Sequence, residues 1–348
     1  MTQAISLSQI LRNEGHELCG VIVGKSKKRK LPDFFVKQIN AKIAHLESPN
    51  FVTDKNQKSV KTIPTIVNAI INSRKYLRSV SKIQALVEEH QPDVIVNFYD
   101  FLGGIYCLLK KPKCKVISLA HQFLIDHPQF DFPSGRIFDR VMLKLANKVV
   151  SIRSSEVLAL SFQKFDDVPK KKLYVVPPLL RKEVREIKVS EGHHLLVYML
   201  NSGYATEVNS FHQKYPQEPL HCFWDKSDAP TELKVDDQLS YHLLDDKKFI
   251  DKMASSKGYV TTAGFESVCE AMYLGKPVLM VPVQGHYEQA CNAIDAHKAG
   301  AGIYSDSFEI EKLIHYLPRY QDVSTWFRKW ADLAPNQYLK YLDNGHHQ

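Results

Sequence analysis

The chain has 348 residues, enough for two ordinary domains, and its hydrophobic content of 44% argues against a disordered or fibrous protein. No apolar run in the sequence is long enough to span a bilayer, and the first residues lack the basic-then-apolar pattern of a signal peptide. Six cysteines are scattered without a C-x-x-C pair, which favours reduced thiols in a cytoplasmic protein over a disulfide scaffold or a zinc site.

Charge is divided unevenly along the chain. Residues 1–190 hold 32 lysines and arginines against 17 acidic residues, whereas the remainder holds 14 against 21. This basic first half predicts an anionic partner, such as a membrane surface or an acidic acceptor. The densest run, KSKKRK at 25–30, is most simply a solvated loop at a strand end. Stacking aromatics and nucleic-acid-binding motifs do not accompany these charges, so nucleic acid is not expected as a partner.

Short β-branched runs alternate with helical patterns throughout, which predicts parallel sheets built from β–α–β units. In the first half the expected strands are 18–24, 93–98, 115–120, 148–152 and 173–178. In the second half they are 194–200, 220–224, 239–244, 258–262 and 277–282. The pattern predicts an α/β protein with two Rossmann-like domains facing each other across a cleft, where ligands bind.

Composition also indicates the domain boundaries. Residues 1–180 are expected to form the N-terminal domain, and the charged segment 181–192, which follows a proline pair, is expected to be a linker. Residues 193–324 are expected to form the C-terminal domain. The aromatic-rich stretch 325–348 reads as helices that pack back on the N-terminal domain.

The most informative stretch is GYVTTAGFESVCEAMYLGKPVLMVPVQGHYEQACNA, residues 258–293. A strand ends at Thr262, a small-residue turn follows at Ala263 and Gly264, and a helix is expected from Phe265. Glycine at this turn lets an anion approach the unpaired amides of the first helical turn, which favours a phosphate or diphosphate. Glycine is also common at such turns for close packing alone, so the turn by itself is weak support.

A second polar cluster follows the next expected strand. The loop after 277–282 carries Gly285 and His286, and the helix after it carries Glu288 and Gln289. Two polar clusters at the ends of adjacent strands suit a sugar nucleotide, with the diphosphate on the first helix terminus and the sugar hydroxyls on Glu288 and Gln289. Glu288 alone would be equally well explained as a solvated glutamate at a helix start, but packing explains the combination poorly.

Residues 258–293 resemble the donor-binding signature of GT-B glycosyltransferases, both UDP-glycosyltransferases and the bacterial UDP-N-acetylglucosamine transferases that make the lipid-linked peptidoglycan precursor. The resemblance implies that Glu270 holds the ribose hydroxyls, the Gly264 turn the diphosphate, and Glu288 with Gln289 the transferred sugar. The usual His-Gly or Ser-Gly before the helix is replaced by TAGF, so no side-chain phosphate ligand is implied there. The residues that match the pattern are Gly264, Glu270, GKP at 275–277, Pro282, EQ at 288–289 and NA at 292–293.

Other donor contacts are implied more weakly. Asn201, Ser202 and Gly203 follow the first strand of the second domain, where family members place a loop beside the phosphates, although a plain turn explains them equally well. Leu244 lies where family members hold the base, mainly through backbone groups. The donor-binding residues that we expect are Gly264, Phe265, Ser267, Glu270, Gly285, His286, Glu288, Gln289, Asn201, Ser202, Gly203 and Leu244.

The acceptor side is expected at strand ends of the first domain. Five polar residues, Asp100, His121, Gln122, Asp126 and His127, are expected to face the cleft there, although any one histidine is more often structural than catalytic. A base must take the acceptor proton, and the catalytic residues that we expect are His121, Asp100 and Asp126. The sequence has no Asp-x-Asp motif for a metal diphosphate, so we expect a metal-independent reaction without a cofactor. Inversion at the anomeric carbon is favoured by the resemblance alone.

The opening stretch MTQAISLSQILRNEGHE resembles a helix that, in these enzymes, follows a first strand and a Gly-x-Gly-x-Gly-His loop. The histidine of that loop is the usual base or lies beside the acceptor. Strand, loop and histidine would all precede Met1, so the first strand of the N-terminal domain is expected to be missing. We favour a start at an internal methionine over a genuinely shortened protein, because Ile5, Leu7 and Ile10 keep an amphipathic pattern.

These features predict a glycosyltransferase that moves a sugar from a UDP-sugar to a hydroxyl of a lipid-linked, polysaccharide or small-molecule acceptor. A sugar-nucleotide epimerase shares the two-domain plan but would need no acceptor groove. A non-catalytic sugar-nucleotide-binding protein is favoured if the short start is authentic. The protein is expected in the cytoplasm, peripheral on the inner face of the membrane, where a basic domain docks on anionic lipids.

Overall fold

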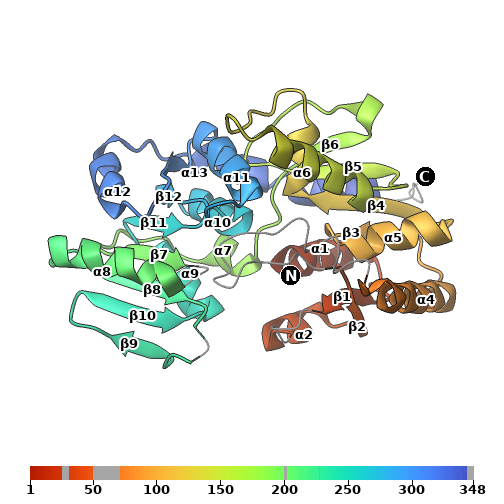
Figure 1. Ribbon diagram of the computed structural model, residues 1–348, viewed down its shortest axis with the longest axis horizontal. Helices are drawn as coiled ribbons and strands as arrows, with labels where there is room; N and C mark the ends of the chain where they lie inside the picture. Colours follow the sequence, from red (N-terminus) through yellow and green to blue (C-terminus); the bar gives the residue numbers. More distant parts are fainter. Residues whose placement is uncertain (26–30, 50–70, 200–201, 227, 343–348) are drawn as a thin grey trace.

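The computed structural model describes residues 1–25, 31–49, 71–199, 202–226 and 228–342. Two α/β parts lie side by side, the first coloured red to yellow-green and the second green to blue in Figure 1. Most of the expected KSKKRK loop lies outside the described residues. Within the described ranges, no helix combines the length and the apolarity that crossing a bilayer requires.

Parallel strands of the first part form two separate sheets. β1 (Val21–Lys25) pairs only with β2 (Ile43–Glu47) among the described residues. The second sheet has the order β3-β4-β5-β6. The strand bounds are β3 (Val94–Asn97), β4 (Lys115–Ala120), β5 (Glu156–Leu160) and β6 (Leu173–Val176). In a doubly wound domain a first strand would lie between β1 and β3. The expected first strand stays a prediction.

Helices of the first part cover its strands. Gly104 of α5 (Phe101–Lys110) packs so closely on α6 (Ile137–Val150) that a Cβ there would lie 2.3 Å from the Val149 carbonyl oxygen. The expected strand at 148–152 is wrong, because its first three residues form the last turn of α6 and continue the pattern of that amphipathic helix. The bounds are α1 (Thr2–Asn13), α2 (Asp33–Ile39), α4 (Ser73–His90), α5 (Phe101–Lys110), η1 (His121–Asp126), α6 (Ile137–Val150), η2 (Pro169–Lys171) and α7 (Lys182–Glu186).

A seven-stranded sheet with the order β13-β12-β11-β7-β8-β10-β9 forms the second part. Only β9 runs antiparallel to its neighbour. Tyr259, Val260 and Leu279 on its central strands are fully buried, as expected where helices cover both faces of a parallel sheet. The strand bounds are β7 (Leu195–Met199), β8 (Leu220–Trp224), β9 (Glu232–Lys234), β10 (Leu239–Leu243), β11 (Gly258–Thr261), β12 (Val278–Met280) and β13 (Gly302–Tyr304).

The last helices return to the first part of the chain. Trp330 donates from its indole nitrogen to the Ser161 carbonyl at 3.0 Å, and the Tyr338 hydroxyl donates to the Pro177 carbonyl at 2.8 Å. Both bonds fix the C-terminal helices beside β5 and β6. The helical bounds of the second part are η3 (Ser202–Tyr204), α8 (Ala205–Lys214), α9 (Asp246–Ala254), α10 (Phe265–Tyr273), α11 (Tyr287–Lys298), α12 (Ile310–Tyr316), η4 (Leu317–Arg319), α13 (Ser324–Ala331) and α14 (Ala334–Leu342).

Candidate active site

The turn between β11 and α10 has an open approach. Helix α10 begins at Phe265, as the sequence predicts, and its N-cap is Gly264, which offers no side-chain cap to the first amides. Among the described residues, the one atom within 4 Å of a Cβ built on Gly264 would be the Ser267 hydroxyl oxygen, at 3.8 Å. Ala263 adopts a left-handed φ of 59°, and its carbonyl accepts a hydrogen bond of 3.1 Å from Asn292. The Asn292 side chain therefore fixes the turn at Ala263, while the space beside Gly264 holds few atoms of the described residues.

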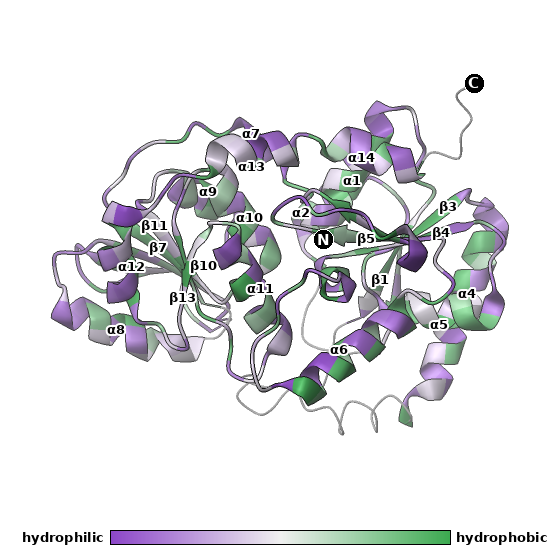
Figure 2. Ribbon diagram, turned by 90° about the horizontal axis from the view of Figure 1, so that it is seen from above, coloured by the Kyte–Doolittle hydropathy of each residue, from purple (hydrophilic) through white to green (hydrophobic). Residues whose placement is uncertain are grey.

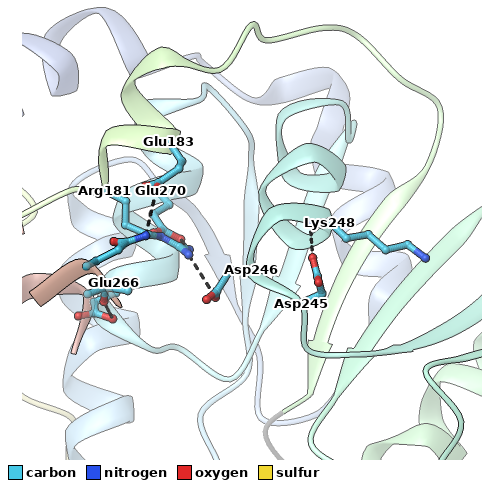
Figure 3. A network of polar contacts seen from close by, with 9 residues as sticks. Arg181, Glu183, Asp245, Asp246, Lys248, Glu266 and Glu270 are labelled. Atoms are coloured by element: carbon cyan, nitrogen blue, oxygen red, sulfur yellow. Dashed lines mark hydrogen bonds and ion pairs between the residues drawn. The ribbon is translucent and has the colours of Figure 1, made fainter. Parts of the chain in front are cut away.

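Glu270 lies two turns into α10, where it is 4% exposed and paired with the interdomain segment. Arg181 donates to both of its carboxylate oxygens, at 2.7 and 2.9 Å, as Figure 3 shows. Asp246 lies 3.3 Å from the same guanidinium. Burial raises the pKa of Glu270 and the Arg181 charge opposes that shift, and the two short bonds are those of an ion pair.

The start of α11 carries the second polar cluster. His286 is the N-cap, and its Nδ1 accepts from the Gln289 amide at 3.4 Å. The Gln289 side-chain oxygen accepts from the Val283 amide at 2.8 Å, which ties the loop after β12 to the helix. Gly285 has a φ of 80°, a value that suits glycine, at the point where this loop turns. The loop and helix start are thus fixed mainly by their own polar groups.

η1 of the first part is in direct contact with α10 and α11 of the second part. Gln122 donates to Glu288 at 2.9 Å, and the His121 ring stacks on Phe265 with 4.1 Å between ring centres. His121 Nδ1 lies 2.7 Å from the Leu160 carbonyl, so this nitrogen carries the proton and Nε2 is the free acceptor. The structure therefore brings Phe265 and Glu288 of the expected donor side together with His121 and Gln122 of the expected acceptor side.

Burial perturbs the ionisable groups at this contact. It lowers the pKa of His121 to about 4 and raises the pKa of Asp295, on the inner side of α11, to about 7. The His121 Nε2 and Asp295 Oδ2 atoms are 3.9 Å apart, and near neutral pH the imidazole is uncharged, so this contact is not an ion pair. Burial also raises the pKa of Glu288 to about 7, although its bond from Gln122 opposes the shift.

The remaining acceptor-side residues differ in position. Asp126 accepts at 2.8 Å from Asn147 of α6, beside η1 and the cleft. Asp100 is the N-cap of α5, where its carboxylate accepts a hydrogen bond from the Leu102 amide at 2.7 Å. This role is structural. His127 is buried, and its Nε2 lies 2.8 Å from the Asp166 carbonyl, within a loop.

The remaining donor-side residues follow other strands of the second sheet. Leu244 is half exposed just after β10, and Ser202 lies in the 3-10 turn η3 after β7. Gly203 is in the same turn, and Asn201 lies outside the described residues. Strand ends of one parallel sheet share an edge, so Leu244 and Ser202 lie on the edge that also carries Gly264.

The comparisons with known proteins agree with this architecture. A family described as "Glycosyl transferase family 1" matches residues 6–320. The UDP-N-acetylglucosamine--N-acetylmuramyl-(pentapeptide) pyrophosphoryl-undecaprenol N-acetylglucosamine transferase of Fusobacterium nucleatum is 23% identical over 270 residues, which cover 69% of this chain and 70% of that protein. The chain belongs to glycosyl transferase family 1.

Solved structures of glycosyltransferases share the fold of this family member. The glycotransferase of kitacinnamycin is similar with a TM-score of 0.64 and 15% identity, covering 98% of this chain and 95% of the other. UGT89C1 of Arabidopsis thaliana in complex with UDP gives 0.62 and 16%, with coverage of 98% and 95%. The GT-B fold and the assignment as a glycosyltransferase enzyme, both expected from residues 258–293, are confirmed.

The sequence reasoning did not identify three residues near the candidate site. Arg181 stands in a segment that reads as a plain charged linker, and only its dense charge is a signal. Asp295 follows Glu288 by seven residues, so it lies on the same face of α11 and could have been found by that spacing. Tyr99 adopts a strained, left-handed φ of 55°, which its sequence does not predict. Its hydroxyl donates to the Asn147 side chain at 2.8 Å.

Proposed function

We propose that this glycosyltransferase takes its sugar from a UDP-sugar whose diphosphate binds at the Gly264 turn. The uncapped amides at the start of α10 supply hydrogen-bond donors and the positive end of the helix dipole. Glu270 is close enough along α10 to bind the ribose hydroxyls, sharing its oxygens with Arg181. UDP is the ligand of one structural neighbour, and the similar Fusobacterium enzyme is named for a UDP-sugar.

The transferred sugar is proposed to lie between α11 and η1. Glu288 reaches into this contact, and Gln289 keeps its amide nitrogen for a sugar hydroxyl because its oxygen is held by Val283. His121 and Asp126 are the proposed proton acceptors, of which His121 is neutral near pH 7 with Nε2 free to accept. We propose an inverting displacement by an acceptor hydroxyl, without metal or cofactor, in which the α10 amides stabilise the leaving diphosphate.

A lipid-linked acceptor fits the charge of the chain best. The basic first half would bring the cleft to an anionic membrane surface, where acceptors of this kind lie. The name of the Fusobacterium enzyme includes an undecaprenol-linked acceptor. We therefore propose a cytoplasmic protein, peripheral on the inner face of the membrane.

Calorimetric titration with UDP, GDP and TDP tests the donor site directly. We expect UDP to bind and Glu270→Gln to weaken that binding, whereas Glu14→Gln, an exposed change at the C-cap of α1, should leave it unaltered. Incubation with UDP-sugars and acceptors then separates the alternatives. Product that forms only with an acceptor supports transfer, an altered sugar nucleotide formed without acceptor indicates an epimerase, and UDP binding without any turnover indicates a non-catalytic binding protein.

A further inference from the structure

Helix α6 presents an unusual row of apolar side chains to solvent. Ile137, Val141, Leu145 and Val149 recur every four residues, which places them on one side of the helix, and Phe138 lies beside them. These five side chains are between 38% and 76% exposed. They are five of the eighteen large exposed hydrophobic side chains among the described residues, so the row is a concentration and not a background level.

A row of cations runs beside the apolar row. Arg140, Lys144 and Lys148 share the same four-residue spacing and lie three residues after successive apolar positions. Within the part of the chain that the structure describes, none of the three forms an ion pair. The single acidic residue of α6, Asp139, is already bonded to Arg136 at 2.8 Å. The outer face of α6 is therefore both apolar and positively charged.

The inner face of the same helix holds the acceptor side of the cleft. Asn147 donates to the Gln122 carbonyl and to Asp126, at 2.9 and 2.8 Å. Arg136, directly before α6, donates to the Gly285 carbonyl at 3.0 Å across the cleft. Figure 2 shows α6 at the periphery of the molecule with hydrophobic residues at its N-terminal end. A surface in contact with α6 would lie about one helix diameter, roughly 10 Å, from the acceptor residues.

We propose that the outer face of α6, defined by Ile137, Phe138, Val141, Leu145 and Val149 with Arg140, Lys144 and Lys148, docks on an anionic lipid bilayer. A cationic helix with an exposed apolar row lies in the plane of the interface, with apolar side chains among the acyl chains and cations at the headgroups. This inference rests on the proposed function and deepens it: docking would present a lipid-linked hydroxyl acceptor to η1 without removing its chain from the bilayer.

Charge argues against a second copy of this chain as the occupant. A two-fold interface built on α6 would set the same three cations against themselves in a poorly solvated space. An anionic bilayer has the complementary charge along the whole row, and the excess of basic residues over the first half of the chain adds attraction at longer range.

Flotation of the full chain with phosphatidylcholine vesicles, with and without phosphatidylglycerol, tests the proposal. We expect binding only to the anionic vesicles, and a loss with increasing salt. The triple variant Arg140→Gln, Lys144→Gln, Lys148→Gln should weaken binding by about tenfold or more. The matched control is Lys75→Gln, Arg78→Gln, Lys82→Gln, which removes three exposed charges from α4 in the same half of the chain.

The apolar row has its own control pair. Phe138→Ser with Val141→Ser should weaken vesicle binding by about tenfold or more, whereas Leu77→Ser on α4 should not. UDP binding and transfer to a water-soluble acceptor should survive in every variant, so a loss of vesicle binding is separable from a failure of the donor site. Equal effects of the α6 and α4 variants, or no binding to anionic vesicles, would overturn the proposal. A dimer that Phe138→Ser dissociates would overturn it in favour of self-association.

Discussion

Arg181 donates to both carboxylate oxygens of Glu270, and this pair ties the segment between the two sheets to the helix that begins at the candidate donor turn. Glu270 is almost fully buried, so without the guanidinium its charge would have no compensating partner. The pair links the interdomain segment, through Arg181, to Glu270, the residue expected to bind ribose. The two residues lie in separate parts of the sequence. A bound ribose would share or replace bonds that now fix the connection.

Arg181→Met should destabilise the protein by about 3–5 kcal/mol, the usual result of removing one partner from a buried ion pair. Replacing both partners, with Arg181→Met and Glu270→Met, should recover much of that loss because no buried charge remains. The matched control is Lys182→Met, which breaks an exposed pair with Glu186 and should cost at most about 0.5 kcal/mol. Urea denaturation measures all three, and equal losses for Arg181→Met and Lys182→Met would contradict the assigned role.

Gly264→Ala separates binding from folding at the donor turn. The added methyl meets only the Ser267 hydroxyl, at 3.8 Å, and φ is −72°, so the loss of stability should stay below about 1 kcal/mol. UDP affinity should fall by about tenfold or more, because the methyl stands where a diphosphate would approach the amides. Gly20→Ala, whose methyl also has room, is the control, and calorimetry measures both. Unchanged UDP affinity in Gly264→Ala would place the diphosphate elsewhere.

Sequence reasoning worked best where local pattern and chemistry coincide. The turn at Ala263 and Gly264 and the helix from Phe265 were predictable, because a buried strand, small residues and an amphipathic pattern follow one another there. The pattern failed at 148–152, where Val149 and Val150 suggested a strand but form the last turn of α6, with Val149 exposed and Val150 buried. β5 (Glu156–Leu160), which follows, was not among the expected strands.

Polar contacts between residues that are far apart in the sequence could not be predicted either. Glu270 was expected to hold the ribose hydroxyls, but its carboxylate is bonded by Arg181, which is 89 residues away in sequence. Likewise, Gln122 and Glu288 form a hydrogen bond between the two parts from positions 166 residues apart. Periodicity reports which face of an element is apolar and says nothing of which distant polar group will satisfy a residue on the other face.

Glu288 and Asp295 should make stability depend on pH above the usual carboxylate range. Their folded pKa values are raised to about 7, from 4.5 and 3.8. The folded state therefore binds more protons than the unfolded state between about pH 4 and 7, and stability should fall as the pH rises through that interval. Glu288→Gln with Asp295→Asn should raise the melting temperature at pH 8 relative to the unaltered protein and flatten the profile. A loss of equal size at pH 5 and pH 8 would contradict this origin.

Three histidines at the second sheet should produce the opposite dependence in acid. Lys252 lies 2.9 Å from His221, and the Ser240 hydroxyl bonds to both His221 and His242, at 2.8 and 2.9 Å. Burial and then the lysine charges lower the pKa of His221 to about 3 and that of His242 to about 4, and His194 shifts in the same direction.

Because the unfolded chain binds these protons near pH 6.5 and the folded chain does not, stability should fall as the pH drops from about 6.5 towards 4. Lys252→Met removes the positive charge beside His221, so the melting temperature should fall less between pH 7 and pH 5 than in the unaltered protein. Lys247→Met, an exposed change on the same helix, is the control and should retain the full acid loss. Scanning calorimetry across this range checks the expectation, and identical acid profiles for the two variants would show that the histidine cluster does not govern it.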